Sequence, residues 1–201
     1  MTAWTFVTRW GNALLLLPTA SWIGLTLWVD GERPAAWRWA ICLGGAVLVV
    51  LATKVAFLGW GIGSRALDFT GISGHGTLAA SVLPMLAWWV TQDRDDATRR
   101  RAVVAALLFA AAVGLSRVIV LAHSPSEVAA GLALGFAVAA LAIPRHRIVD
   151  ARVPLRWLVV AGLVAVGSLS QAGDGDDAHG IVVRIALLLS GRQAPFDRTM
   201  L

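Results

Sequence analysis

The chain has 201 residues, of which 58% are hydrophobic and only 14% are charged, and its mean hydropathy is +0.73. This composition excludes an ordinary soluble domain and is typical of an integral membrane protein built from helices. The net charge of +5 does not indicate nucleic-acid binding, because the arginines stand between apolar runs and form no basic stripe with interleaved aromatic residues.

Six apolar runs have about the length needed to cross the hydrocarbon core of a bilayer as helices. In chain order they are Gly11–Val29, Trp39–Leu58, His75–Val90, Ala102–Ala122, Glu127–Ile143 and Trp157–Ala172. The third and the sixth are the shortest. The sequence therefore predicts an all-α, polytopic membrane bundle of about six transmembrane helices, organised as a single membrane-embedded domain over residues 1–201.

The last part of the chain, residues 173–201, differs from the runs before it. It is polar at first and then holds a short apolar piece, Ile181–Leu189, which Arg184 interrupts. This piece is too short to span a bilayer as a helix, so we expect it to lie along the membrane interface.

Tryptophan is frequent, whereas tyrosine is absent. All ten tryptophans except Trp22 stand near the ends of apolar runs. Because indole rings concentrate at the two membrane–water interfaces, these positions indicate interfacial anchors.

The arginines between the runs predict the orientation of the chain. They cluster in the connections 30–38, 91–101 and 144–156, whereas the connections 59–74 and 123–126 contain only Arg65. By the positive-inside rule the arginine-rich connections are cytoplasmic, and the other two connections and both termini face outward. Three C-terminal arginines oppose this orientation, because they lie on the side predicted to face outward: Arg184, Arg192 and Arg198. We expect a bacterial inner membrane, with the outward face toward the periplasm.

Lys54 is the only lysine in the chain and stands near the outer end of the second run. One interpretation is a side chain that snorkels, with its ammonium group at the lipid headgroups. An ionisable group within a span is also a candidate for function, and an ammonium group suits the binding of a phosphate oxygen.

The triplet Ser73-Gly74-His75 opens the third run and has glycines on both sides. If the helix starts at about His75, then Ser73 and Gly74 occupy its N-terminal cap region. Free backbone N–H groups and the positive end of the helix dipole favour an anion there. The alternative is an ordinary serine cap followed by a surface histidine.

A third group of polar residues lies at the end of the fourth run. Arg117 is a charge within an apolar segment, and Pro125 favours a break in the helix beside His123. The stretch from Ser124 to Glu127 also has the pattern of a capping box with proline at the first helical position. Glu127 could therefore cap the fifth helix, hydrogen-bond the His123 ring, or do both.

All these groups are expected at the outer ends of spans two to five. They are Lys54, Ser73, Gly74, His75, Arg117, His123 and Glu127. Two cations, a helix N-terminus and two histidines form a site for a tetrahedral anion. A histidine backed by a carboxylate has its second ring nitrogen free to attack, and the other histidine can protonate a leaving oxygen. The pattern predicts phosphoryl transfer.

From about Lys54 to Gly131 the sequence resembles the type 2 phosphatidic acid phosphatase family, whose members hydrolyse lipid phosphates and pyrophosphates without a metal. The family's third motif is matched by Ser116, Arg117 and His123, with Glu127 at the aspartate position. The second is matched by Ser73, Gly74 and His75, with Ile72 in place of proline. The first motif is a lysine followed by Arg-Pro, and only its lysine is matched, by Lys54. Arg65 lies farther along the chain than the family's arginine and has no proline after it.

The resemblance implies a role for each residue. His123 is the nucleophile that forms a phosphohistidine, Glu127 orients it, and His75 is the general acid. The phosphate ligands are Lys54, Arg117, Ser73, Gly74 and, as a further candidate, Arg65. No metal or other cofactor is implied, and the substrate is a lipid phosphate such as undecaprenyl pyrophosphate, phosphatidic acid or phosphatidylglycerol phosphate. Hydrolysis and phosphotransfer both remain open.

Two other classes of function are considered. The stretch Gly71-Ile72-Ser73-Gly74 also matches the Gly-x-Ser-Gly of rhomboid intramembrane proteases, with Ser73 as nucleophile and His123 as base. That interpretation leaves Lys54 and Arg117 unexplained. A non-enzymatic lipid-binding or transport protein would use the charges to line a pathway, but no pair of inverted repeats supports it.

Overall fold

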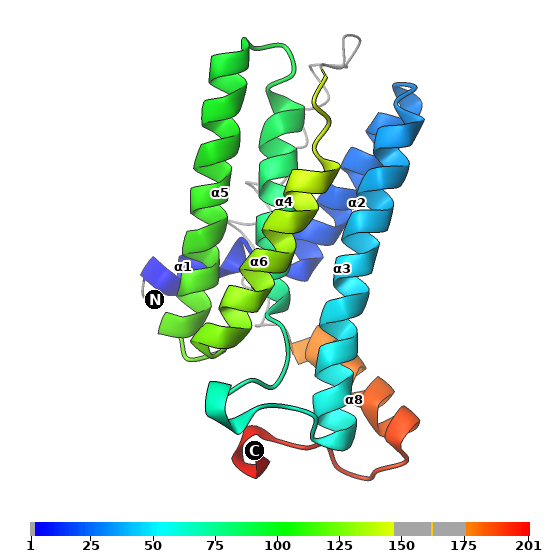
Figure 1. Ribbon diagram of the computed structural model, residues 1–201, viewed down its shortest axis with the longest axis vertical. Coiled ribbons are helices and arrows are strands. Elements are labelled where there is room, and N and C mark those ends of the chain that lie inside the picture. Colours follow the sequence, from blue (N-terminus) through cyan, green and yellow to red (C-terminus); the bar gives the residue numbers. More distant parts are fainter. Residues whose placement is uncertain (1–2, 147–161, 163–175) are drawn as a thin grey trace.

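The computed structural model describes residues 3–146, 162 and 176–201, and within these residues the protein is helical, with no β-sheet (Figure 1). The helices are α1 (Ala3–Arg9), α2 (Ala13–Val29), α3 (Arg33–Trp60), α4 (Gly74–Val90), α5 (Asp96–Ile119), α6 (Pro125–Ala142) and α8 (Asp176–Ser190). Two 3-10 turns, η1 (Arg65–Leu67) and η2 (Arg198–Met200), complete them. The predicted all-α class is confirmed.

Four helical segments of the described residues are long and apolar enough to cross a membrane. They are Ala3–Val29, Arg33–Trp60, Asp96–Ile119 and Pro125–Ala142. The shorter α4, of 17 residues, lies at the centre of the bundle and packs against α2, α3, α5 and α6. These helices confirm a polytopic bundle, and the sixth expected span, Trp157–Ala172, lies outside the described residues.

Helix boundaries differ from the expected spans where polar residues extend a helix beyond its apolar part. The helix α5 begins at Asp96, well before the expected start at Ala102, because the Asp95 side chain caps it by accepting a 2.9 Å hydrogen bond from the Thr98 N–H. It ends at Ile119, and Leu121 adopts a left-handed conformation with φ of 59° in the turn that follows. The expected break beside His123 is therefore present.

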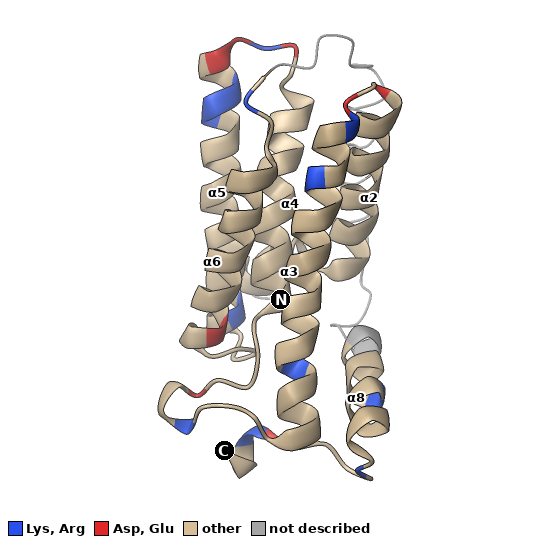
Figure 2. Ribbon diagram, turned by 45° about the vertical axis from the view of Figure 1, so that its right-hand side comes forward, with Lys and Arg blue, Asp and Glu red and all other residues tan. Residues whose placement is uncertain are grey.

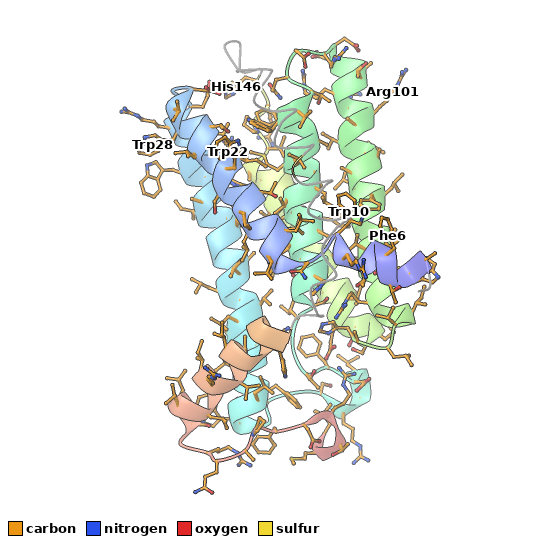
Figure 3. The ribbon with its side chains drawn as sticks, turned by 180° about the vertical axis from the view of Figure 1, so that it is seen from behind. Phe6, Trp10, Trp22, Trp28, Arg101 and His146 are labelled. Atoms are coloured by element: carbon orange, nitrogen blue, oxygen red, sulfur yellow. The ribbon has the colours of Figure 1, made fainter. Side chains whose placement is uncertain are left out.

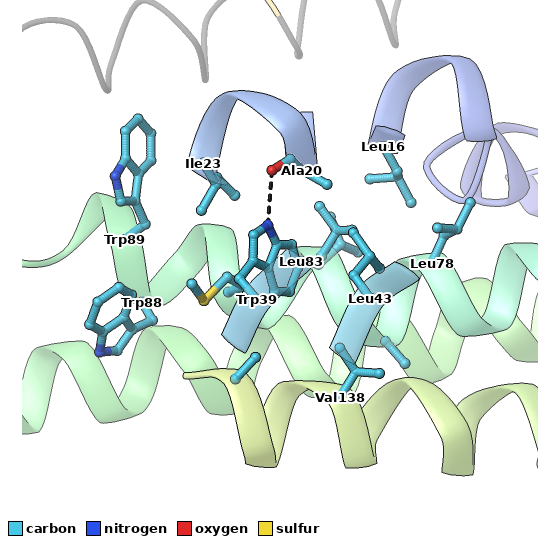
Figure 4. Close-up of a cluster of buried hydrophobic side chains, with 14 of the residues drawn as sticks. Leu16, Ala20, Ile23, Trp39, Leu43, Leu78, Leu83, Trp88, Trp89 and Val138 are labelled. Atoms are coloured by element: carbon cyan, nitrogen blue, oxygen red, sulfur yellow. Dashed lines mark hydrogen bonds between the residues drawn. The ribbon is translucent and has the colours of Figure 1, made fainter. Parts of the chain in front are cut away.

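Within the described residues, the larger hydrophobic core lies where α2, α3, α4, α5 and α6 meet (Figure 4). Trp39 of α3 is 2% exposed, and its indole N–H donates a 2.9 Å hydrogen bond to the Ala20 carbonyl of α2. Trp88 and Trp89 of α4 are also buried. The expectation that these three rings lie against lipid at the interface is wrong, because they fill space between helices.

Glycines allow α4 and α6 to approach each other closely. A Cβ atom at Gly135 of α6 would lie 2.5 Å from the Thr77 carbonyl oxygen and 2.6 Å from the Ala80 Cβ. One at Gly131 would lie 2.6 Å from the Ser73 carbonyl oxygen. Small residues at helix contacts are the usual way in which membrane helices reach this separation.

Replacing Gly135 by alanine is expected to lower the free energy of unfolding by about 1–3 kcal/mol, because backbone atoms of α4 must move to admit the methyl group. Gly44→Ala is the matched control, since a Cβ at Gly44 of α3 meets nothing within 4 Å. That substitution should leave stability unchanged or raise it by up to about 1 kcal/mol. Unfolding in detergent measures both, and equal effects would contradict the close packing.

The two ends of the bundle differ in the connections that they carry. Arg101 and His146 lie at one end (Figure 3), where α2 joins α3 and α4 joins α5. The connections 61–73 and 120–124 lie at the opposite end, together with η2 and the first turn of α6, which carries the acidic residue of that helix (Figure 2). Helix α8 packs against α3 near this second end, through a small cluster of Val55, Phe57, Leu58 and Ala186.

Candidate active site

Glu127 is the residue on which this end of the bundle converges. It stands at the third position of α6, and its side chain is fully buried. The capping box is present: the Ser124 hydroxyl accepts from the Glu127 N–H at 3.3 Å, and the Glu127 Oε2 accepts from the Ser124 N–H at 3.2 Å. The same Oε2 lies 2.7 Å from Nδ1 of His123. Glu127 thus caps the helix and contacts the histidine ring at once.

Two further segments donate hydrogen bonds to the Glu127 carboxylate. Its Oε1 accepts from the N–H and the hydroxyl of Thr70, at 2.7 and 2.6 Å. The Arg198 guanidinium of η2 lies 2.8 Å from Oε1 and 2.9 Å from Oε2. All these partners are donors, which matches an ionised carboxylate that only accepts. The buried charge is therefore fully hydrogen-bonded.

His123 is held in the short turn between α5 and α6. Because the carboxylate accepts from Nδ1, the proton lies on Nδ1 and Nε2 keeps its lone pair. Nε2 has no hydrogen-bond partner among the described residues. Burial lowers the pKa of the His123 ring from its usual value and outweighs the hydrogen bond to Glu127, while the charge of Lys54 acts in the same direction as burial. The ring is neutral at neutral pH.

The loop between α3 and α4 brings the start of α4 to this carboxylate. Gly71 has φ of +149°, and a Cβ there would lie 3.0 to 3.2 Å from atoms of Lys54, so the loop packs directly on α3. The Ile72 N–H donates to the Thr53 hydroxyl at 3.1 Å, and the Ser73 N–H donates to the Glu127 carbonyl at 3.1 Å. These bonds fix the loop between α3 and α6.

Ser73 is the N-cap of α4, and Gly74 and His75 are its first two residues. The Ser73 side chain is fully buried, and its hydroxyl accepts from the Gly76 N–H at 3.4 Å. The other N–H groups of the first turn have no partner within the helix, which is the usual basis of anion binding at such a position. The serine cap of the alternative interpretation is therefore present, at a helix start that is also suited to an anion.

Cationic and imidazole groups surround the His123 ring. His75 is close enough to Arg117, His123 and Lys54 for their charges to act on its ring. Lys54 interacts in the same way with Glu127 and Arg117. The Arg117 guanidinium also donates to the Thr8 hydroxyl of α1 at 3.0 Å. Residues distant in sequence, from α1, α3, α4, α5, α6, η2 and two connections, thus contribute to one cluster.

Arg65 stands apart from this cluster. It lies in η1 and is exposed, and no hydrogen bond or ion pair joins its side chain to another residue in the described part of the chain. Within the same residues, no three His, Cys, Asp or Glu side chains are grouped in a way that could hold a metal ion.

Sequence reasoning missed four residues of the cluster: Thr8, Thr53, Thr70 and Arg198. Thr70 lies three residues before Ser73, and this closeness to the Ser-Gly-His triplet was the one feature of the sequence that could have indicated it. Arg198 follows Glu127 by 71 residues along the chain and was visible in the sequence only as a cation that opposed the topology count. Its role depends on a tertiary contact that no local pattern encodes.

Comparison with known proteins agrees with the motifs. A family model for the PAP2 superfamily matches residues 60–149. A protein of Klebsiella pneumoniae, named an uncharacterized 22.5 kDa protein in the cps region, is 37% identical over 200 residues, which cover 98% of this chain and 96% of the relative. No solved structure gives a significant match. The chain belongs to the PAP2 superfamily, as its resemblance to the type 2 phosphatidic acid phosphatases predicted.

Proposed function

We propose that this protein is an integral membrane phosphatase that hydrolyses a lipid phosphate or pyrophosphate through a phosphohistidine on His123. Membership of the PAP2 superfamily supports a phosphatase-type hydrolase. The observation that carries the mechanism is the 2.7 Å contact between His123 Nδ1 and Glu127 Oε2, because it leaves Nε2 with a lone pair and without a partner in the described residues.

In the first step the Nε2 lone pair of His123 attacks phosphorus, so that a P–N bond forms and the P–O bond to the leaving group breaks. The ring then carries a positive charge, which the Glu127 carboxylate stabilises through Nδ1–H. His75 protonates the leaving oxygen, which belongs to a lipid alcohol or, for a pyrophosphate, to the lipid monophosphate. For this transfer His75 must be protonated, and the negative charge of a bound phosphate favours its imidazolium form.

In the second step water attacks phosphorus, the P–N bond breaks, and His75 takes the proton that the water loses. Inorganic phosphate leaves and His123 is neutral again. Lys54, Arg117 and the N-terminus of α4 at Ser73 and Gly74 bind the phosphate oxygens and the charge that grows on them. Arg65 lies outside the cluster, so we assign it no role in phosphate binding.

A lipid substrate fits the position of the site. The cluster lies at one end of a bundle whose outer surface exposes large apolar side chains such as Leu48, Leu108 and Leu141. A phosphate headgroup can enter at that end while its hydrocarbon chain stays beside the helices. Undecaprenyl pyrophosphate, phosphatidic acid and phosphatidylglycerol phosphate have this form. The arginine distribution supports an orientation with the site on the side away from the cytoplasm, which in a bacterial inner membrane is the periplasmic side.

The test is phosphate release by detergent-purified protein from these three lipids, with a chelator present. We expect release from at least one lipid and, after rapid quenching, a phosphoprotein that survives alkali and is lost in acid, as a phosphohistidine is. Label that moves to a second lipid would identify the same site as a phosphotransferase. No release and no phosphoprotein from a folded protein would contradict the proposal.

Ser73→Ala separates the phosphatase from the protease interpretation in the same assay. The Ser73 hydroxyl is a buried helix cap, so its loss is expected to cost about 1 kcal/mol of stability and to weaken turnover without ending it. A serine protease would lose all its chemistry with this hydroxyl. Phosphate release that persists in the variant therefore excludes Ser73 as the nucleophile.

A further inference from the structure

The residues after α8 return to the proposed active site. We call residues 191–201 the C-terminal strap. It turns at Gly191, whose φ is +68°, and crosses the end of α3, where the Phe196 N–H donates to the Leu58 carbonyl at 2.9 Å. The Phe196 ring covers Gly61, and the Arg192 guanidinium lies 4.0 Å from the centre of that ring. The strap is thus fixed by contacts that do not involve Arg198.

Arg198 connects a buried carboxylate with a surface one. Its Nη2 lies 2.8 and 2.9 Å from the two oxygens of Glu127, and 3.3 Å from the Thr70 hydroxyl. Its Nη1 lies 2.6 Å from Oδ2 of Asp68. The Glu127 side chain is 0% exposed, and those of Arg198 and Asp68 are 40% and 56% exposed. A rigid guanidinium held by two carboxylates has little rotational freedom.

We propose that Arg198 is a positioning residue, which holds the Glu127 carboxylate at the angle that directs His123 Nε2 toward the phosphorus atom. This inference rests on the proposed function of His123 as nucleophile. Glutamate has one more rotatable bond than the aspartate of the family motif, so its carboxylate needs more partners to be fixed. Thr70 restrains Oε1 and the Ser124 N–H restrains Oε2. Arg198 is the partner that contacts both oxygens.

The charge of Arg198 has a second effect on His123. The groups that face the ring are Lys54 from α3, His75 from α4, Arg117 from α5 and Glu127 from α6, and Asp68 faces Arg198 from the loop. The Arg198 charge offsets part of the negative charge that Glu127 presents to the imidazole. Without Arg198, Glu127 favours the imidazolium more strongly, and the pKa of His123 rises.

Arg198→Ala and Arg192→Ala form a matched pair, since both remove an arginine from the strap and only Arg198 contacts Glu127. For Arg198→Ala we expect kcat to fall by about tenfold to a hundredfold with KM unchanged, because the nucleophile is misaligned. The acid limb of the kcat/KM profile should move to higher pH, because His123 is protonated over a wider range. Arg192→Ala should match the wild type, and Arg198→Lys should restore part of the rate.

A histidine titration followed by NMR tests the contact without an assay. We expect the His123 midpoint to move to higher pH in Arg198→Ala and to stay in place in Arg192→Ala. If the wild type releases no phosphate but this shift is present, the proposed function fails and the contact of Arg198 with the His123–Glu127 pair stands. Unchanged kcat and an unmoved midpoint would overturn the inference. A raised KM at constant kcat in Arg198→Ala would also overturn it, because that result indicates that Arg198 binds the phosphate. Equal losses of activity in Arg198→Ala and Arg192→Ala, with lower melting temperatures in both, would overturn it as well, because they indicate a general loss of stability.

Discussion

His123→Gln is expected to lower the rate of phosphate release by about 10⁴-fold or more, because the substitution removes the nitrogen that forms the bond to phosphorus. The glutamine amide can still donate to the Glu127 carboxylate, so the hydrogen bonds that close this end of the bundle are largely kept. Phosphate release and phosphoprotein formation are measured on the same sample, and both should disappear together.

His146→Gln is the control for this experiment. His146 lies at the opposite end of the bundle, where its Nε2 is 3.0 Å from Glu32 and its side chain is 58% exposed (Figure 3). The chemical change is the same, but the distance from the cluster is large, so full activity is expected. A His123→Gln protein that still hydrolyses lipid phosphate would remove His123 from the role of nucleophile.

Glu127→Gln is expected to lower kcat by about 10³-fold to 10⁴-fold, as loss of the carboxylate partner of a catalytic histidine generally does. Glutamine can still take part in a capping box, so α6 should begin at the same residue. Its NH₂ group, however, takes the place of Oε2, where it faces the Nδ1 proton of His123, or of Oε1, where it faces Thr70, and it meets the Arg198 guanidinium in both orientations. The His123 proton can then shift to Nε2, which destroys the nucleophile.

Glu127→Asp tests the fit of the longer side chain. Aspartate is the residue of the family motif, but the contacts with His123, Thr70 and Arg198 are at hydrogen-bond distance from a glutamate carboxylate. We expect activity between that of Glu127→Gln and that of the wild type. Glu127→Gln with normal kcat, in a protein whose His123→Gln variant is inactive, would show that the carboxylate does not orient the ring.

The motifs and the apolar runs were enough to predict most of the local structure around the candidate site residues. Ser73 does start α4, the chain does break beside His123, and Glu127 does both cap α6 and contact His123. These features are local, because a cap or a break depends on residues a few positions apart in the chain. Hydropathy likewise located the central part of each described span, since burial in lipid depends on composition.

What the sequence could not predict depends on contacts between distant segments. Nothing near Trp39 distinguishes a ring that bonds to Ala20 in the core from one that anchors at an interface. In the same way, Arg184, Arg192 and Arg198 are three cations near the C-terminus, and no local pattern marks Arg198 as the one that contacts the Glu127 carboxylate. Arg65 was the arginine nearest in sequence to the missing motif position, and the fold leaves it exposed.

The capping box of α6 has a consequence for thermal behaviour. The Glu127 side chain contacts four segments at once: the first turn of α6, the turn that holds His123, the loop before α4, and η2. Proteins open locally at free energies below that of global unfolding, and terminal turns and loops open most readily. Opening any of these segments withdraws a partner from the same carboxylate. We therefore expect the contacts of Glu127 to be lost together on heating, before the helices between the two ends of the bundle separate.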